Sequence, residues 1–211
     1  MKVLSKLKWK VSIYNRKRKL SYILEEIPEN STLLDVGVAP IKNVPTNYAN
    51  YLDEYFLKKD RRFDALGLER SGDFTFFKNR YTNCNLILFD GRHFPDFLTL
   101  KPYDIALSNA VIEHVGTREE QLQWLKGLRS VCKRLIITTP NKYFPVESHT
   151  NILLRHIFSK QCREWLLSKR KINLFSLKEF IEILENAGFQ VEKIKKNKLL
   201  FMTLDFVIVC K

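Results

Sequence analysis

The chain has few cysteines, and they are far apart. Its 211 residues include only four cysteines, at positions 84, 132, 162 and 210. The usual zinc signatures need closely spaced pairs of ligands, so the sequence excludes them and we expect no metal site. Cys132 and Cys210 lie in apolar segments and are typical of small buried side chains. Unpaired cysteines fit a reducing, cytoplasmic environment.

Long hydrophobic runs are missing as well. No apolar stretch approaches the roughly 18 residues that cross a bilayer, so we expect no membrane span. No apolar core with a cleavage site follows the basic N-terminus, so a secretion signal is not expected either. Hydrophobic residues make up 45% of the chain and charged residues 28%, which predicts a globular protein of one domain.

Acidic residues are fewer than basic ones: 23 aspartates and glutamates stand against 36 lysines and arginines, so the net charge is +13. Lysine and arginine are dense within residues 2–19 and recur at 169–171 and 193–198. Such an excess attracts nucleic acid, anionic lipid or anionic metabolites. Ordinary solvated helix faces explain it at least as well. Both interpretations stay open: an anionic surface, membrane or RNA, bound through the basic N-terminus, or no such partner.

The hydrophobic pattern alternates between stretches of helical periodicity and short unbroken apolar runs. Residues 3–27 mix basic and apolar positions and predict one or two amphipathic helices. Beyond Pro28, short unbroken apolar runs are typical of strands buried on both faces, and amphipathic stretches separate them. This alternation predicts a parallel sheet with helices on both faces. The expected strands are 32–36, 65–68, 86–89, 105–108 and 135–138, and the expected helices are 46–59, 72–80 and 117–133.

The C-terminal third predicts a different connection. Ser176 and Glu179 have the spacing of a capping box, so a helix is expected to begin there. Two strands then follow in direct succession, at 190–195 and 204–210, with a basic turn expected near Asn197. A parallel crossover needs roughly a dozen residues, so these two strands are expected to pair antiparallel or as near neighbours.

Candidate binding residues follow the expected strands, because ligands of doubly wound sheets bind beyond the carboxyl ends of the strands. Asp35 and Gly37 follow the first strand, where glycine permits close approach of a ligand. Glu69 follows the second strand, where an acidic residue can accept hydrogen bonds from both ribose hydroxyls of an adenosine. Asp90 and Gly91 follow the third, where a carboxylate can accept a hydrogen bond from an adenine amino group. Ordinary turns and helix starts explain each of these alone about as well.

The segment after the fourth strand resembles a known family. Residues 103–115 read Tyr-Asp-Ile-Ala-Leu-Ser-Asn-Ala-Val-Ile-Glu-His-Val. Together with Asp-Val-Gly and the acidic ends of the second and third strands, they resemble in order and spacing the class I S-adenosylmethionine-dependent methyltransferases, most closely the bacterial type 11-like group. Residues 138–150, which begin Thr-Thr-Pro-Asn, look like the segment after the fifth strand of that group. The resemblance covers about residues 30–211.

This resemblance implies an α/β fold: a doubly wound, mostly parallel seven-stranded sheet with a C-terminal antiparallel hairpin, Rossmann-like. It implies a methyltransferase domain at 30–211, with an acceptor-side lid at about 140–170. The pattern of residues 1–29, which the resemblance does not cover, predicts a basic N-terminal extension that forms an amphipathic helix. The implied cofactor is S-adenosylmethionine, which leaves as S-adenosylhomocysteine.

The resemblance also implies where the cofactor binds. The first loop would border its methionine portion, Glu69 and its neighbour its ribose, the third loop its adenine, and the fourth strand's end its sulfonium. The implied cofactor-binding residues are Asp35, Gly37, Asn47, Glu69, Arg70, Asp90, Gly91, Asn109 and Ala110. The first loop departs from the family, whose loop has several glycines, because residues 38–40 read Val-Ala-Pro here. That departure leaves room for a degenerate site.

The candidate catalytic residues lie in the segments that carry the resemblance. A general base is needed only where the acceptor is a protonated hydroxyl or a similar group. His114, at the mouth of the fourth strand, is the first candidate; alternatively, Glu113 and His114 only cap the next helix. His149, with Glu147, lies in the expected lid, and a packed loop histidine is the alternative there.

Missing motifs narrow the function further. A Gly-x-Gly-x-x-Gly loop and a P-loop are both absent, which disfavours dinucleotide and nucleoside triphosphate binding. No Asn/Asp-Pro-Pro-Tyr and no Pro-Cys follow the fourth strand, which disfavours adenine and cytosine methylation in DNA. The leading hypothesis is O-methylation of a small molecule or of a saccharide or lipid-linked acceptor. The enzyme would be a cytoplasmic monomer or homodimer, peripheral at the inner membrane surface. An RNA methyltransferase and a catalytically silent scaffold are the alternatives.

Overall fold

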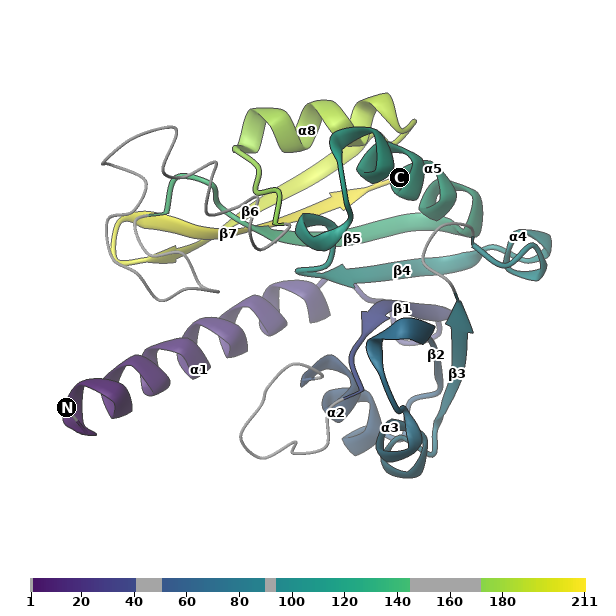
Figure 1. The fold of residues 1–211 in the computed structure, drawn as a ribbon, viewed down its shortest axis with the longest axis horizontal. Helices are drawn as coiled ribbons and strands as arrows, with labels where there is room; N and C mark the ends of the chain where they lie inside the picture. The colour runs from purple at the N-terminus through teal and green to yellow at the C-terminus, as the bar shows by residue number, and fades with distance from the viewer. Residues whose placement is uncertain (1, 41–50, 90–93, 145–171) are drawn as a thin grey trace.

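A seven-stranded sheet runs through the protein (Figure 1). This computed structural model describes residues 2–40, 51–89, 94–144 and 172–211. The strands are β1 (Leu33–Val38), β2 (Phe63–Leu68), β3 (Cys84–Phe89), β4 (Tyr103–Asn109), β5 (Cys132–Pro140), β6 (Val191–Leu199) and β7 (Met202–Cys210). They lie in the order β3-β2-β1-β4-β5-β7-β6. The first five pair in parallel, whereas β7 is antiparallel to both β5 and β6.

The winding of the sheet reverses between β1 and β4. From β1 the chain first adds β2 and β3 on one side, and then returns to add β4 and β5 on the other. The prediction of a doubly wound, mostly parallel sheet that ends in an antiparallel hairpin is therefore confirmed. In such sheets the reversal point is where ligands bind.

The position of the hairpin turn differs from the prediction. A turn was expected near Asn197, but β6 continues to Leu199 and the turn lies at Leu200 and Phe201. Asn197 is buried within β6. Its amide oxygen accepts a hydrogen bond from Arg18 Nε at 2.7 Å, and its Nδ2 donates to Asp205 Oδ2 at 3.0 Å. These distant partners satisfy a polar side chain that sequence alone assigns to a turn.

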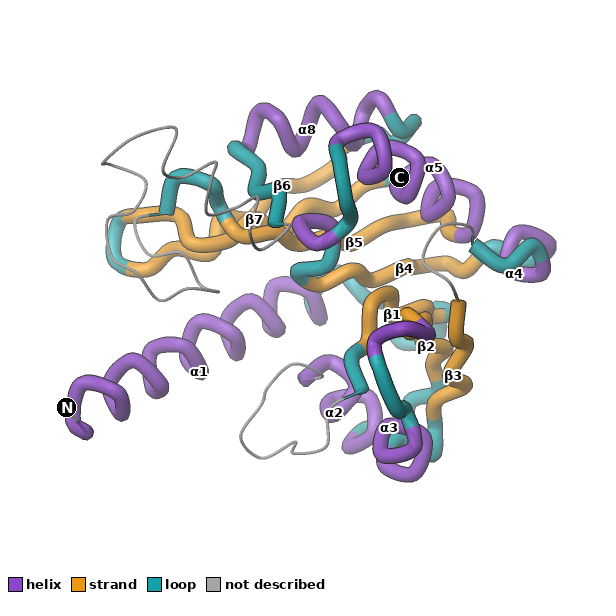
Figure 2. Tube along the Cα trace, in the orientation of Figure 1, coloured by secondary structure: helices purple, strands orange, loops and turns teal. Residues whose placement is uncertain are grey.

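Helices cover both faces of the sheet (Figures 1 and 2). The expected segment 46–59 is described from residue 51 onward, as α2. α4 was not expected, because four residues are too few to give a hydrophobic period. The helices are α1 (Lys2–Leu24), α2 (Tyr51–Lys58), α3 (Thr75–Arg80), α4 (Phe97–Leu100), α5 (Arg118–Val131) and α8 (Leu177–Asn186), with short 3-10 turns η2 (Glu69–Ser71) and η3 (Ile112–His114).

α1 is a single helix whose inner face is partly polar. Its buried residues Asn15, Lys19 and Ile23 recur every four positions, so they share one face, which packs on β6 and β7. Among the helices of the described residues, none is long and apolar enough to cross a membrane. Both buried polar residues have partners: Asn15 Oδ1 accepts from Arg18 of the same helix at 3.1 Å, and Lys19 pairs with Asp205 in the candidate site described below.

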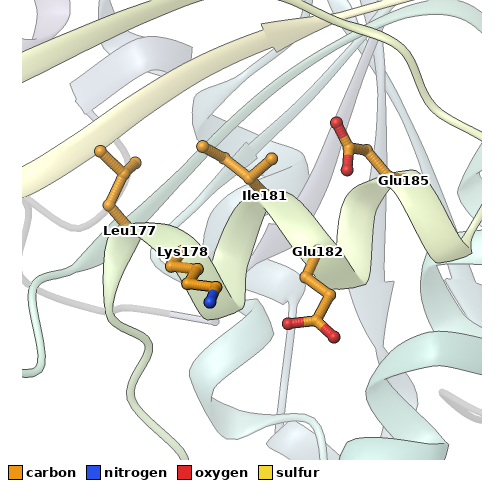
Figure 3. Close-up of a pocket in the computed structure, with 5 residues that line it drawn as sticks. All are labelled: Leu177, Lys178, Ile181, Glu182 and Glu185. Carbon is orange, nitrogen blue, oxygen red and sulfur yellow. The ribbon is translucent and has the colours of Figure 1, made fainter.

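The predicted capping box at the start of α8 is confirmed. The Ser176 hydroxyl accepts from the Glu179 backbone N–H at 3.3 Å, and a Glu179 carboxylate oxygen accepts from the Ser176 N–H at 2.7 Å. A hollow runs along this helix (Figure 3), and those of its lining residues that the structure describes belong to α8. They are Leu177, Lys178, Ile181, Glu182 and Glu185.

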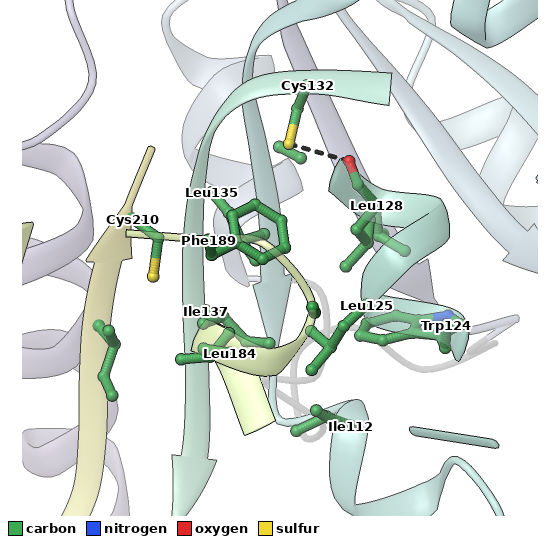
Figure 4. Close-up of a cluster of buried hydrophobic side chains, with 14 of the residues drawn as sticks. Ile112, Trp124, Leu125, Leu128, Cys132, Leu135, Ile137, Leu184, Phe189 and Cys210 are labelled. Atoms are coloured by element: carbon green, nitrogen blue, oxygen red, sulfur yellow. Dashed lines mark hydrogen bonds between the residues drawn. The ribbon is translucent and has the colours of Figure 1, made fainter. Parts of the chain in front are cut away.

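Each face of the sheet has its own hydrophobic core. Side chains of α5 and α8, such as Leu128 and Leu184, pack on one face with Cys132 and Cys210 among them (Figure 4). Side chains of α1, α2 and α3 pack on the other face. Burial raises the pKa of both thiols to about 12, which fits their expected role as small hydrophobic side chains. The two cores hold the strand ends in place.

Candidate active site

Three loops meet at the carboxyl ends of β1, β2 and β4. Gly37, one residue before the end of β1, has φ +95°, and a Cβ placed there would lie 2.4 Å from Val111 Cγ2 of the loop after β4. Only glycine tolerates both this backbone conformation and this contact. A Cβ at Gly72, after β2, would lie 3.5 Å from Pro40 Cγ of the first loop. The structure therefore brings together three of the four loops in which we expected the cofactor-binding residues, whereas residues 90–93 after β3 lie outside the described residues.

The end of β4 is held in an unusual conformation. Ala110 has φ +57°, which is rare for a residue other than glycine. Its backbone N–H donates to the carbonyl and hydroxyl oxygens of Thr138, each at 3.1 Å. The Thr138 hydroxyl in turn donates to Asn109 Oδ1 at 2.9 Å. Strained backbone that the surroundings fix in this way is typical of functional sites.

A pair of buried carboxyl groups lies behind the first loop. Asp35 of β1 is hydrogen-bonded to Asp53 of α2, and the two are 6% and 1% exposed. Burial raises the pKa of Asp35 to about 7, and burial together with the neighbouring Asp35 raises the pKa of Asp53 well above its usual range. Near neutral pH the pair therefore shares a proton. Asp53 was not anticipated, because an acidic residue in a first helical turn is ordinary.

Three buried side-chain oxygens near this edge have no hydrogen-bond partner among the described residues. They are the Tyr51 hydroxyl, Asp53 Oδ1 and the Ser108 hydroxyl. Tyr51 and Asp53 begin α2, and Ser108 lies one residue before the end of β4. Buried polar atoms without partners are uncommon in native proteins. They fit a site that a polar ligand completes.

A buried ion pair lies on the other side of β4. Lys19 of α1 has its ammonium nitrogen 3.9 Å from Asp205 Oδ2 of β7. Asp205 pairs with Pro140, so it lies at the carboxyl end of β5. Burial lowers the pKa of Lys19, but the charge of Asp205, with smaller contributions from Tyr51 and Glu113, outweighs burial and raises the pKa overall. Lys19 is therefore a buried cation, and sequence reasoning missed it because it lies in a uniformly basic helix.

Glu113 is fixed beside this ion pair. It is fully buried, and Thr139 Oγ1 donates to its Oε2 at 3.3 Å. Its backbone carbonyl accepts from the Asn173 N–H at 2.8 Å. The neighbouring His114 side chain is exposed. Neither residue caps α5, because Thr117 does so in a capping box with Glu120, so the interpretation of Glu113 and His114 as caps is wrong.

The remaining expected residues divide into two groups. Glu69 and Arg70 follow β2 directly, in η2, and both side chains are exposed. The others, both cofactor-binding and catalytic, lie outside the described residues. These are Asn47, Asp90, Gly91, Glu147 and His149. In the described ranges, no group of three or more His, Cys, Asp or Glu side chains is arranged to hold a metal ion.

Comparison with known proteins gives a family match. The sequence matches a family described as methyltransferase domain over residues 12–194. A search of curated proteins gives no match.

Several solved structures share the fold at low sequence identity. Magnesium protoporphyrin IX methyltransferase from Synechocystis PCC 6803 with bound SAH has 12% identity and a TM-score of 0.57, over 95% of this chain and 81% of that chain. An S-adenosylmethionine-dependent methyltransferase from Mesorhizobium loti has 12% identity and a TM-score of 0.61, over 90% of this chain and 95% of that one. LepI in complex with SAH and a substrate analogue has 10% identity and a TM-score of 0.59, over 87% of this chain but only 43% of LepI.

Proposed function

The chain belongs to the methyltransferase domain family and is a class I S-adenosylmethionine-dependent methyltransferase, and from this premise we propose that it methylates an oxygen atom of an acceptor bound between α1 and the ends of β4, β5 and β7. The observation that carries this proposal is the buried Lys19, in electrostatic contact with Asp205, Tyr51 and Glu113 at the carboxyl edge of the sheet. A charged and polar site of this kind suits a polar acceptor.

The cofactor side of the site is proposed from the strand ends. Asp35 and Gly37, with Asn47, would border the methionine portion; Glu69 and Arg70 the ribose; Asp90 and Gly91 the adenine; and Asn109 and Ala110 the sulfonium. The converging loops, the obligatory glycine and the unpartnered Asp53 Oδ1 support this assignment. When bound, the cofactor supplies an electrophilic methyl group on a sulfonium.

The protein's own contribution is alignment and exclusion of water. Methyl transfer is an in-line displacement, so the acceptor oxygen must be held in line with the methyl group and the sulfur. The unpartnered Tyr51 hydroxyl can donate a hydrogen bond to an acceptor oxygen, and α1 covers the polar site from one side. His114 is the proposed base where the acceptor is a protonated hydroxyl, with His149 the second candidate.

The division of the chain is also a proposal. We assign residues 1–29 to an N-terminal extension, 30–211 to the methyltransferase domain and about 140–170 to an acceptor-side lid. Two backbone hydrogen bonds support the lid: the Lys142 N–H donates to the Phe175 carbonyl at 2.9 Å, and the Asn173 N–H to the Glu113 carbonyl at 2.8 Å. The described residues on either side of 145–171 therefore lie close together, beyond the ends of β4 and β5.

Two experiments test the function. Titration calorimetry with S-adenosylmethionine should give saturable binding by the folded protein; no binding would favour a silent scaffold instead. Incubation of cell-extract fractions with methyl-labelled cofactor should place the label in the small-molecule, saccharide or lipid fraction. Label that enters RNA, with salt-sensitive RNA binding, would favour an RNA methyltransferase. A cytoplasmic location and a monomeric or homodimeric state are part of the same proposal.

A further inference from the structure

Large apolar side chains are exposed at two opposite ends of the molecule. Leu200 and Phe201, in the β6–β7 turn, are each 82% exposed. Phe97 and Leu100 of α4 are 56% and 85% exposed. The turn lies at one end of the long axis and α4 at the other (Figure 1). The two ends differ in the charges that surround them.

The β6–β7 turn is surrounded by positive charge. Lys196 and Lys198 of β6 are exposed and make no ion pair with a described residue, whereas Lys193 and Lys195 are paired with Glu25 and Glu26. α1 adds to this charge, because Arg18 binds Asn197 in β6. The hairpin-tip surface, as defined here, consists of Lys196, Lys198, Leu200 and Phe201 with Tyr14 of α1, whose ring lies 5.4 Å from the Arg18 guanidinium that binds β6.

The conformation of Leu200 indicates that its side chain is not there for the fold. Leu200 has φ +56°, a conformation that asparagine or glycine adopts more readily than leucine. Its side chain gains almost no burial in return. A large aliphatic residue at an exposed, conformationally unfavourable turn position suits contact with something outside the chain.

The hairpin-tip surface lies at the same edge of the sheet as the candidate site. The Asn141 N–H, just beyond β5, donates to the Leu204 carbonyl at 2.8 Å, and Asn141 Nδ2 donates to the Thr203 carbonyl at 2.9 Å. The turn at Leu200 and Phe201 therefore lies beyond the carboxyl end of β5. Lys19 and Asp205 lie between this turn and the cofactor loops along the same edge.

We propose that the hairpin-tip surface docks the protein on an anionic lipid bilayer, with Leu200 and Phe201 inserted and the lysines against the headgroups, and that the methyl acceptor is a lipid or lipid-linked molecule of that bilayer. The second part rests on the proposed function. Apolar side chains flanked by lysine match an anionic interface, which has a charged surface over an apolar interior. Single-stranded RNA offers the same phosphates, and its bases can stack on Phe201 and Tyr14. Base stacking makes no use of the aliphatic Leu200 at the tip, whereas the apolar interior of a bilayer does, so the bilayer is the occupant that we propose.

The test is cosedimentation of the full-length protein with vesicles of phosphatidylcholine and phosphatidylglycerol in equal parts. The wild type should bind them and should not bind phosphatidylcholine alone. Leu200→Asn with Phe201→Ser should weaken binding about tenfold or more, because the inserted apolar area is lost. Asparagine is chosen because it accepts the backbone conformation of Leu200, so the variant should fold. Lys196→Gln with Lys198→Gln, or about 0.5 M salt, should weaken binding by removing or screening the charge.

The matched control is a double variant of α4, the other place where large apolar side chains are exposed. Leu100→Asn with Phe97→Ser removes the same two residue types from α4 and should bind vesicles like the wild type. A second measurement is direct, relative to the wild type with its three tryptophans: brominated lipid should quench the fluorescence that Phe201→Trp adds, and it should not quench the fluorescence that Leu100→Trp adds. Melting curves and S-adenosylhomocysteine binding report whether each variant is folded.

Each outcome is decisive. Equal vesicle binding by both double variants, or no binding by the wild type, overturns the docking proposal. If the wild type binds single-stranded RNA instead, or if the tip variant changes only self-association, the surface has a different occupant and the proposal fails. Vesicle binding needs no cofactor, so a protein that binds vesicles but not S-adenosylmethionine would refute the proposed function and leave the docking in place.

Discussion

The two halves of the candidate site are built in different ways. On the β1 side, the paired carboxyl groups of Asp35 in β1 and Asp53 in α2 are only 18 positions apart in the sequence. On the β5 side, Lys19 and Asp205 are 186 positions apart in the sequence and meet only because α1 packs on β7. The first half holds a shared proton, and the second holds a buried ion pair. In the proposed function, the half built from residues close together in the sequence binds the cofactor, which is common to the family. The half assembled from distant residues binds the acceptor, which is particular to this protein.

The largest expected effect is at the first loop. Gly37→Ala should lower the free energy of unfolding by about 3 kcal/mol and abolish cofactor binding, because the new methyl group meets Val111 at 2.4 Å and the backbone is left-handed. Gly188→Ala is the matched control: its φ is +88°, but nothing lies within 4 Å, so only about 1 kcal/mol should be lost. Urea unfolding and calorimetry measure both. Equal losses at the two glycines would contradict the contact between the β1 and β4 loops.

The next effect concerns the cofactor alone. Glu69→Ala should weaken S-adenosylmethionine binding by about 1–3 kcal/mol, because two charge-assisted hydrogen bonds to the ribose are lost. Stability should change little, since Glu69 is exposed. Calorimetry measures the affinity, with Glu182→Ala on α8 as an exposed control. An affinity equal to that of the wild type would remove the ribose assignment.

A change on the β5 side of the site should lower methyl transfer and leave the cofactor affinity nearly unchanged. Lys19→Met should leave cofactor affinity within about twofold and lower methyl transfer about tenfold, or about 1.4 kcal/mol, because the cation of the acceptor side is lost. Lys17→Met, exposed on the same helix, should change neither. Calorimetry and transfer of labelled methyl groups separate the two quantities. Loss of cofactor affinity at Lys19 would show that the two halves are not distinct.

The smallest expected effect is a pH dependence of stability. The pKa of Asp35 is raised to about 7 by burial and that of Asp53 is also raised, so the folded state binds more protons than the unfolded state above about pH 4. The free energy of unfolding should therefore fall as pH rises from about 4 to 7. Asp53→Asn removes one of the two titrating groups and should be about 1 kcal/mol more stable than the wild type at pH 8, with no gain at pH 4. Parallel pH curves for the two proteins, measured by urea unfolding with exposed Asp96→Asn as control, would argue against the shared proton.

Sequence reasoning worked best where structure depends on neighbours in the chain. The seven strands, the helix that Ser176 begins and the antiparallel hairpin follow from hydrophobic period, capping and connection length. It was wrong where a distant partner decides. Asn197 was expected at a turn but is buried in β6 by contacts with Arg18 and Asp205, and Glu113 was given a capping alternative that Thr117 excludes.

By itself the sequence determined which residue types stand at the ends of the first four strands. They are an acidic residue or glycine at each of the first three and the Asn-Ala step at the fourth. Only the tertiary structure decided which side chains share a buried environment. Lys19 in a basic helix and Asp53 in an ordinary first turn look solvated in the sequence. Packing removes water from both, and the energy of a buried charge depends on whatever group lies a few ångströms away, however distant it is along the chain.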